Sequence, residues 1–244
     1  MRKLFWILLI VGLVSFAEAQ TGLPKISIGM GEAKTQSDVS SSLQIMALLT
    51  VLSLAPALMI LTTAFTRIVI ILSFVRTALG TTSIPPNQVI IGLSLFLTFF
   101  VMGPTWNRVN NEALQPYFKK TITQEQAIER ASAPVRQFML KNTYEKDLKL
   151  FLGIRKEKPK NANDVSMTTL IPAFVISELK TAFIVGFYIF VPFLIIDLIV
   201  ASGLMSMGMM MLPPSMVSLP AKLLVFVLAD GWGTLITAIL SGFR

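Results

Sequence analysis

Long apolar stretches constrain this chain more than any other feature of its sequence. They cover about residues 43–65, 89–106, 170–204 and 223–239, and each is long enough to form a helix of several turns. Inside a bilayer the backbone polar groups must be satisfied within their own segment, which an α-helix achieves and an open sheet does not. We therefore predict an all-α integral membrane protein with two long apolar helical hairpins.

The composition supports this class and excludes others. Of the 244 residues, 54% are hydrophobic and only 14% are charged, whereas soluble domains carry about 25% charged residues. The chain has no His and no Cys, which removes imidazole and thiol catalysis and nearly every zinc or iron site. We expect no enzyme activity and no cofactor. The net charge is +8, but no basic stripe is interleaved with aromatic residues, so we expect no nucleic-acid partner.

The first 19 residues have the order of a secretory signal peptide. A basic pair precedes a short apolar run, and Ala17-Glu18-Ala19 places small residues at the positions that a signal peptidase reads. We predict cleavage between Ala19 and Gln20. Residues 20–42 are polar with little periodicity, and we expect a flexible external segment.

Residues 43–106 are interpreted as the first helical hairpin. Pro56 should kink its first helix. The apolar pattern continues past Arg67 to Arg76, which is too long for one straight crossing and predicts a tilt or a bend. The second helix of this hairpin is expected to run from Val89 to Trp106.

Residues 107–165 are predicted to form a small helical domain in the periplasm. Thr123 and Gln126 fit a capping box, Pro134 should mark a break or a new first turn, and Glu145 and Lys149 fit a favourable pair four residues apart. The basic residues here would favour the cytoplasm under the positive-inside rule. We give precedence to the signal peptide, which fixes the orientation first.

Residues 166–244 are interpreted as the second hairpin. Pro172 and Pro192 should interrupt its first helix, and the last helix is expected from Leu223 to Ile239. The connection between them is rich in methionine and ends in a Pro-Pro pair, as does the turn at residues 80–86. That echo is too short to establish a repeat.

The methionine cluster is the first candidate functional site. Its members are Met205, Met207, Met209, Met210 and Met211. Methionine is unbranched and polarizable, so a surface lined with it can adapt to different partners. Gly208 and the following prolines indicate a loop, which has less core to fill than a helix. Core packing and a lining or sealing role both remain open.

Charged residues embedded in apolar stretches are the second candidate site. They are Arg67, Glu178, Lys180, Asp197 and Asp230. A charge at the centre of a lipid-facing helix costs about 3 kcal/mol on insertion scales, so these side chains should face protein or water. They could form structural ion pairs, line a polar conduit or be catalytic. Glu178 and Lys180 are two residues apart and cannot face each other on one helix. Asp197 and Asp230 could form a protease-like pair, but nothing around them specifies a nucleophilic water.

Several longer motifs resemble those of one family. They are Phe65-Thr66-Arg67-Ile68, Ala78-Leu79-Gly80-Thr81, Pro85-Pro86-Asn87-Gln88-Val89, Phe96-Leu97-Thr98-Phe99-Phe100, Pro172-Ala173-Phe174, the segments 177–183 and 192–197, Met207-Gly208-Met209-Met210-Met211, Leu219-Pro220, Lys222-Leu223 and Asp230-Gly231-Trp232. Together they resemble the FliP family of flagellar type III export-gate proteins, over about residue 43 to the C-terminus. Ile184-Val185 departs slightly from the expected pattern.

The resemblance implies a function that composition does not show. Family members are expected to form a homo-oligomeric ring of five copies with FliQ and FliR and other membrane proteins of the export apparatus. The ring would export unfolded flagellar proteins across the bacterial inner membrane at the flagellar basal body. Met207, Met209, Met210 and Met211 would then form a pore gasket. The alternative is a proton- or ion-coupled transporter that uses the embedded carboxylates, and an intramembrane hydrolase is a weaker third hypothesis.

Overall fold

The computed structural model describes residues 36–81, 84–209 and 211–243, and all regular structure in these ranges is helical. This confirms the all-α prediction. The predicted signal peptide, with Ala19 and Gln20, and most of the external segment lie outside the described residues. The chain divides into two units, 1–50 and 51–244, and the second is described below.

Two of the described helical stretches are long and apolar enough to cross a membrane, Asn87–Phe118 and Met167–Ser206. The number rises to four if two bent helix pairs are each counted as one span. The apolar sequence thus forms membrane-compatible helices, as expected.

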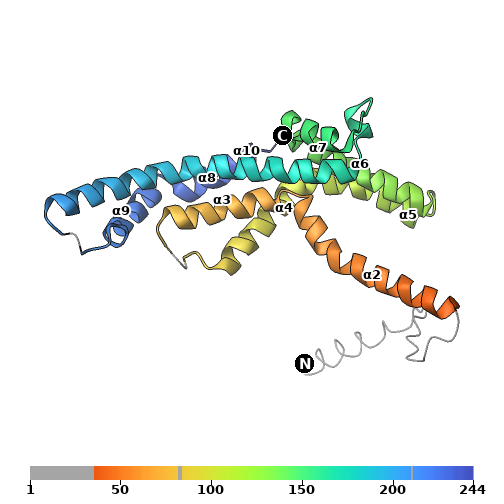
Figure 1. Ribbon diagram of the computed structural model, residues 1–244, viewed down its shortest axis with the longest axis horizontal. Coiled ribbons are helices and arrows are strands. Elements are labelled where there is room, and N and C mark those ends of the chain that lie inside the picture. Colours follow the sequence, from red (N-terminus) through yellow and green to blue (C-terminus); the bar gives the residue numbers. More distant parts are fainter. Residues whose placement is uncertain (1–35, 82–83, 210, 244) are drawn as a thin grey trace, which may run out of the picture. The chain divides into compact units, whose positions relative to one another are not determined.

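The first hairpin begins with a broken helix. Helix α2 (Gln36–Leu61) ends before α3 (Phe65–Ala78) begins, so the long apolar pattern is not one straight rod. Pro56 lies inside α2, and the break comes after it, at residues 62–64. Helix α3 packs against both α4 and α8, as Figure 1 shows for α8. Its buried face has helical spacing, at Ile68, Ile71, Leu72 and Val75.

The second helix of this hairpin is longer than expected. Helix α4 (Asn87–Val109) continues without interruption through a π-helical turn, η1 (Asn110–Leu114), into α5 (Gln115–Phe118). It therefore passes Trp106, the predicted end of the apolar helix, and enters the predicted periplasmic domain.

Residues 107–165, predicted to be the periplasmic domain, contain helices that pack on the long ones. Helix α6 (Gln124–Asn142) starts at the predicted capping box of Thr123 and Gln126, which is confirmed. It continues through Pro134, so the predicted break there is wrong. Pro134 removes one backbone donor, and its burial against neighbouring helices offsets part of that cost. Helix α7 (Glu145–Arg155) is followed by a 3₁₀ turn, η2 (Ala162–Asp164). The predicted pair of Glu145 and Lys149 is present at 2.6 Å.

Helix α8 (Met167–Ser206) has 40 residues and contains both Pro172 and Pro192. The predicted interruptions are therefore wrong. Each proline removes a single hydrogen bond of the ladder, and α8 packs along α3, α6, α7 and α9, which hold it in line. At 1.5 Å per residue it is about 60 Å long, roughly twice the hydrocarbon thickness of a bilayer.

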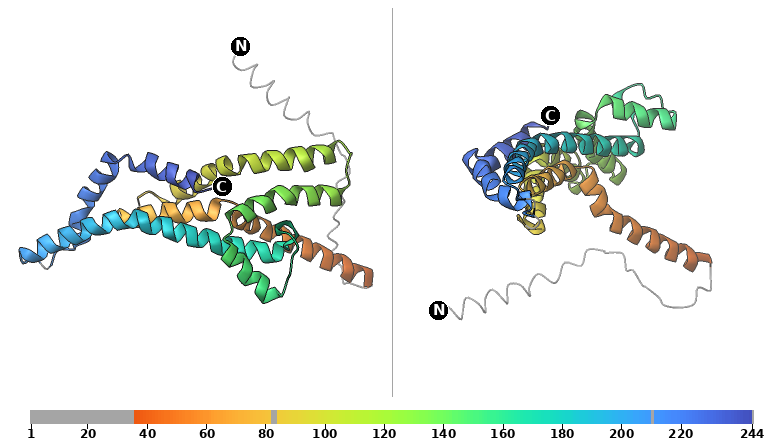
Figure 2. Two further views of the ribbon diagram at one scale, coloured as in Figure 1. Left: turned by 90° about the horizontal axis from the view of Figure 1, so that it is seen from above. Right: turned by 60° about the vertical axis from the view of Figure 1, so that its left-hand side comes forward.

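The last apolar stretch forms two helices instead of the single one expected. Helices α9 (Pro214–Leu228) and α10 (Gly231–Ser241) are bent by 66° at a short break, which is visible at the dark blue end of the chain in Figure 2. Asp230 adopts a left-handed conformation with φ of 47°, which Asp tolerates better than most residues. A Cβ on Gly231 would overlap the Phe226 ring, so glycine permits the close packing at this bend.

Helices α3 and α8 end in the same way. Gly80 follows α3 and Gly208 follows α8, with φ of +75° and +73°. In each turn the amide after the glycine bonds to the carbonyl five residues earlier, and the glycine amide bonds to the carbonyl three residues earlier. These two bonds define a Schellman motif, which ends a helix at a left-handed glycine. In both turns a Pro-Pro pair starts five residues after the glycine.

Candidate functional site

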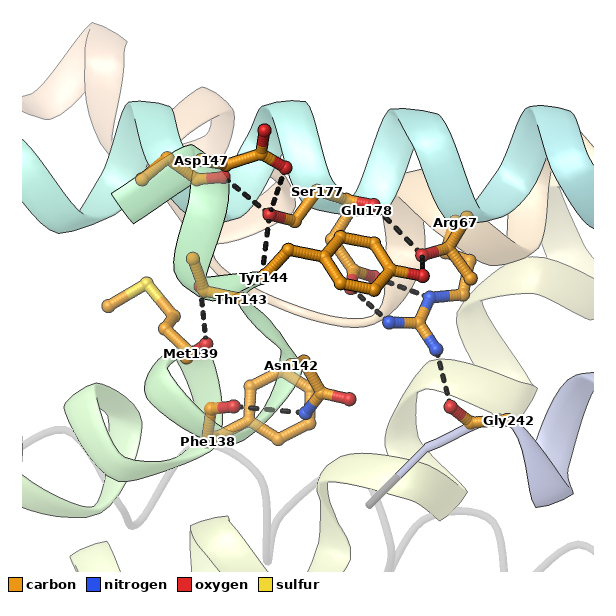
Figure 3. A network of polar contacts seen from close by, with 12 residues as sticks. Arg67, Phe138, Met139, Asn142, Thr143, Tyr144, Asp147, Ser177, Glu178 and Gly242 are labelled. Carbon is orange, nitrogen blue, oxygen red and sulfur yellow. Dashed lines mark hydrogen bonds and ion pairs between the residues drawn. The ribbon is translucent and has the colours of Figure 1, made fainter. Parts of the chain in front are cut away.

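Arg67 on α3 and Glu178 on α8 form a buried ion pair. Their side chains are 4% and 0% exposed. Arg67 Nε donates to Glu178 Oε2 at 3.0 Å, and Arg67 Nη2 donates to Oε1, so the contact is bidentate. Arg67 Nη1 donates to the carbonyl of Gly242 at 2.7 Å, and the Phe243 ring lies 4.1 Å from the guanidinium carbon. Figure 3 shows Arg67 bridging Glu178 and Gly242.

This arrangement explains how two charges are retained in an apolar setting. Both carboxylate oxygens of Glu178 accept bonds from Arg67, and the remaining guanidinium edge meets a carbonyl and an aromatic face. A buried pair is weak evidence for net stability, but removing one partner leaves an uncompensated charge. The pair also fixes the C-terminal residues against the α3–α8 core.

A second polar cluster attaches α7 to α8. Asp147 is buried, and it accepts bonds from Lys180 Nζ and from Ser177 Oγ, the latter at 2.8 Å. Ser177 Oγ also accepts the backbone amide of Tyr144 at 3.0 Å, as Figure 3 shows. Burial raises the pKa of Asp147, but the hydrogen bonds from Lys180 and Ser177 and the Lys180 charge outweigh it and leave that pKa below its usual value.

The third cluster ties the second hairpin together close to its turn. Asp197 on α8 accepts Ser218 Oγ at 2.5 Å and Lys222 Nζ at 2.6 Å, both from α9. The Lys222 side chain is 3% exposed and that of Asp197 is 27% exposed. The carboxylate is therefore neutralised within the chain, and α8 and α9 are held side by side.

Four of the five embedded charges thus have ion-pair partners in the chain. Asp230 differs, because it is exposed at the α9–α10 bend and forms no ion pair among the described residues. The partners Asp147, Lys222 and Ser218 were not predicted. Lys222 is a lone charge in an apolar stretch and could have been found by the same argument, whereas Asp147 lies in a polar segment that gives no such signal. Within the described ranges no cluster of acidic residues could hold a metal ion.

The Met-rich turn projects from the end of the α8–α9 hairpin. Met205, Met207 and Met209 are 64%, 67% and 42% exposed, and Met211 is 98% exposed. Met210 lies outside the described residues. Within a single chain these side chains do not fill a core, which removes the packing interpretation for the isolated subunit.

Sequence comparison identifies the family. The model of the FliP family matches residues 48–239, which is most of the chain. The chain belongs to the FliP family. Curated relatives include the flagellar biosynthetic protein FliP of Bacillus subtilis, 57% identical over 207 residues, which cover 84% of this chain and 94% of the relative. The FliP of Aquifex aeolicus is 43% identical over 247 residues, which cover both chains fully. The FliP of Pectobacterium carotovorum is 54% identical over 203 residues, which cover 83% and 79%.

The family assignment confirms the resemblance drawn from the motifs. The matched range, residues 48–239, contains the Met-rich turn and all five embedded charges. The long apolar helices agree with a membrane protein.

Proposed function

We propose that this chain is a non-enzymatic subunit of the flagellar type III protein export gate in the bacterial inner membrane. Five copies form a ring with FliQ and FliR, next to other membrane proteins of the export apparatus, and unfolded flagellar proteins pass through it. Membership of the FliP family and its similarity to flagellar biosynthetic proteins support the flagellar role. Residues 107–165 face the periplasm in this proposal, and their amphipathic helices promote association of subunits.

The observation that carries the channel role is the exposed Met-rich turn on a fixed hairpin. A rigid support is provided by Asp197, Ser218 and Lys222, which link α8 to α9. Beyond that support the Met side chains find no core in their own chain. If several copies meet at an axis, Met207, Met209, Met210 and Met211 converge on one constriction.

Methionine suits a constriction that must both seal and yield. Apolar thioethers exclude hydrated ions by dewetting the narrow point. The side chain has three rotatable bonds and no branch at Cβ, so it can rearrange around a passing polypeptide. A β-branched residue would close the pore but adapt less, and alanine would leave a gap.

The test is ion leakage through rings in which Met209, Met210 and Met211 are all changed to Ala. We expect intact assembly and a higher ion conductance across the membrane in the absence of cargo. Met216→Ala is the matched control, because Met216 is 73% exposed on α9 beyond the turn. Equal conductance of the triple variant and the parent, in rings shown to be intact, would contradict the gasket.

The alternative of an ion-coupled transporter has less support. Such a carrier needs carboxylates that are free to bind and release an ion. Glu178 is fully engaged by Arg67, and Asp197 by Ser218 and Lys222. Glu178 and Asp197 would each have to break an ion pair in every cycle. Asp230 forms no ion pair among the described residues, but it stands alone at the exposed α9–α10 bend.

A further inference from the structure

A groove between α4, α6 and the C-terminal residues is not used by the proposed function. Its volume is about 520 Å³, and its walls include Phe100 and Arg108 from α4, Lys141 from α6, and Leu240 and Phe243 from the C-terminal end. Its lining combines apolar side chains with two cationic ones, Arg108 and Lys141. The groove therefore has the character of an amphiphile site.

The apolar and cationic parts of the groove meet along α4. Phe100, Pro104 and Arg108 are spaced four residues apart, so each lies about one turn after the last, and all three line the groove. Phe96 lies one turn before Phe100. Phe96 and Phe100 are 77% and 72% exposed, so their rings face lipid or another protein. From Phe96 to Arg108 the helix rises about 18 Å, close to the ~15 Å of one bilayer leaflet's hydrocarbon.

The polar end of the groove holds two cations and no described acidic lining residue. Arg108 Nε donates to Glu112 Oε1 at 3.0 Å, and Arg108 Nη1 donates to Gln137, which orients the guanidinium. The Arg108–Glu112 pair is about half exposed on both sides, so it is weak and leaves Arg108 able to bind a further anion. Lys141 makes no ion pair with any residue in the described ranges.

The depth of this end agrees with a bilayer surface. Trp106 lies two residues before Arg108, and Trp is enriched where a helix leaves the hydrocarbon. Above that level an anionic headgroup would meet Arg108 and Lys141, and below it an acyl chain would lie on Phe100 and Phe96.

We propose that this groove binds one anionic phospholipid per subunit. Its phosphate pairs with Arg108 and Lys141, and one acyl chain covers Phe100, Leu240 and Phe243. Neutral lipids lack the net charge that two cations select, and a free phosphate would leave the apolar wall uncovered. The inference concerns the membrane environment of the subunit and does not depend on protein export.

The test is native mass spectrometry of the full-length protein extracted from vesicles of equal parts phosphatidylglycerol and phosphatidylethanolamine. We expect one retained phosphatidylglycerol per subunit. The double variant R108Q/K141Q should lower that retention at least tenfold, and K141R alone should preserve it. Lys149→Gln is the matched control, because Lys149 is an exposed lysine on α7 away from the groove.

Three outcomes would overturn the proposal. Equal retention in the double variant would show that the cations do not select the lipid. Displacement of the lipid by millimolar inorganic phosphate would show that only an anion is recognised. Because the chain has no native Cys, Arg108→Cys and Lys141→Cys can be combined cleanly, and a disulfide between two copies would show that another subunit fills the groove.

Discussion

Glu178→Gln tests the buried ion pair with the least change in shape. Glutamine keeps an oxygen that can accept a hydrogen bond, but it removes the negative charge that balances Arg67. Arg67 would then keep only uncharged partners: the amide oxygen at position 178, the Gly242 carbonyl at 2.7 Å and the Phe243 ring at 4.1 Å. Since both side chains of the pair are at most 4% exposed, water cannot replace the lost partner.

Removing one partner of a buried pair costs about 3–5 kcal/mol. We expect Glu178→Gln to lower the free energy of unfolding by about that amount, a large part of the roughly 5–15 kcal/mol typical of a folded domain. Replacing both residues, with Arg67→Met and Glu178→Leu, removes the charges together. The double variant should be at least about 2 kcal/mol more stable than the single one, because no buried charge remains.

The assay is denaturant unfolding of the purified protein in detergent micelles. Glu145→Gln is the control, because Glu145 forms an ion pair with Lys149 in which both side chains are at least 70% exposed, and such pairs contribute about 0–1 kcal/mol. If Glu178→Gln costs no more than this control, or if the double variant shows no recovery, our account of the pair is wrong.

Three further predictions follow from described contacts. Asp197→Ala leaves the buried Lys222 without its ion-pair partner. It should lower the yield of rings, measured by size-exclusion chromatography, and Asp197→Glu should lower that yield less. Gly208→Ala should cost about 1–2 kcal/mol in thermal unfolding, because its φ of +73° is left-handed; Gly203→Ala, inside α8 with open space around it, should cost nothing. The pKa of Asp147 is lower in the folded chain, so its contribution holds above about pH 4 and disappears as the pH falls through that lowered pKa. Hydrogen exchange in α7 should show this loss, and Asp147→Asn should reduce the pH dependence.

Much of the fold could be predicted from the sequence, because the length of each apolar stretch indicates a helix that can cross a membrane. The proline positions could not be interpreted correctly. Pro134, Pro172 and Pro192 all lie inside helices, since packing on neighbouring helices outweighs the loss of one hydrogen bond. The break at Asp230 was not predicted, because the apolar pattern around it gives no sign that this residue adopts a left-handed backbone conformation.

The embedded charges could be found from the sequence, but their pairing could not. The free-energy cost of a charged side chain in lipid predicts that each has a partner. It does not predict which residue that partner is. The pair of Arg67 and Glu178 joins residues 111 positions apart, and Lys180 reaches Asp147 in a different helix. Such partners depend on how α3, α7 and α8 pack, which local pattern does not encode.

The matched turns after α3 and α8 have a consequence for how this chain can vary. Each begins with a left-handed glycine and reaches a Pro-Pro pair at the same spacing, but the three residues after the glycine are Thr-Thr-Ser in one and Met-Met-Met in the other. The left-handed glycine therefore ends the helix in both turns, whereas the triplet that follows differs in chemistry between them. A mutation that alters the triplet changes what the turn presents to its surroundings, whereas one that alters Gly80 or Gly208 changes where the helix stops.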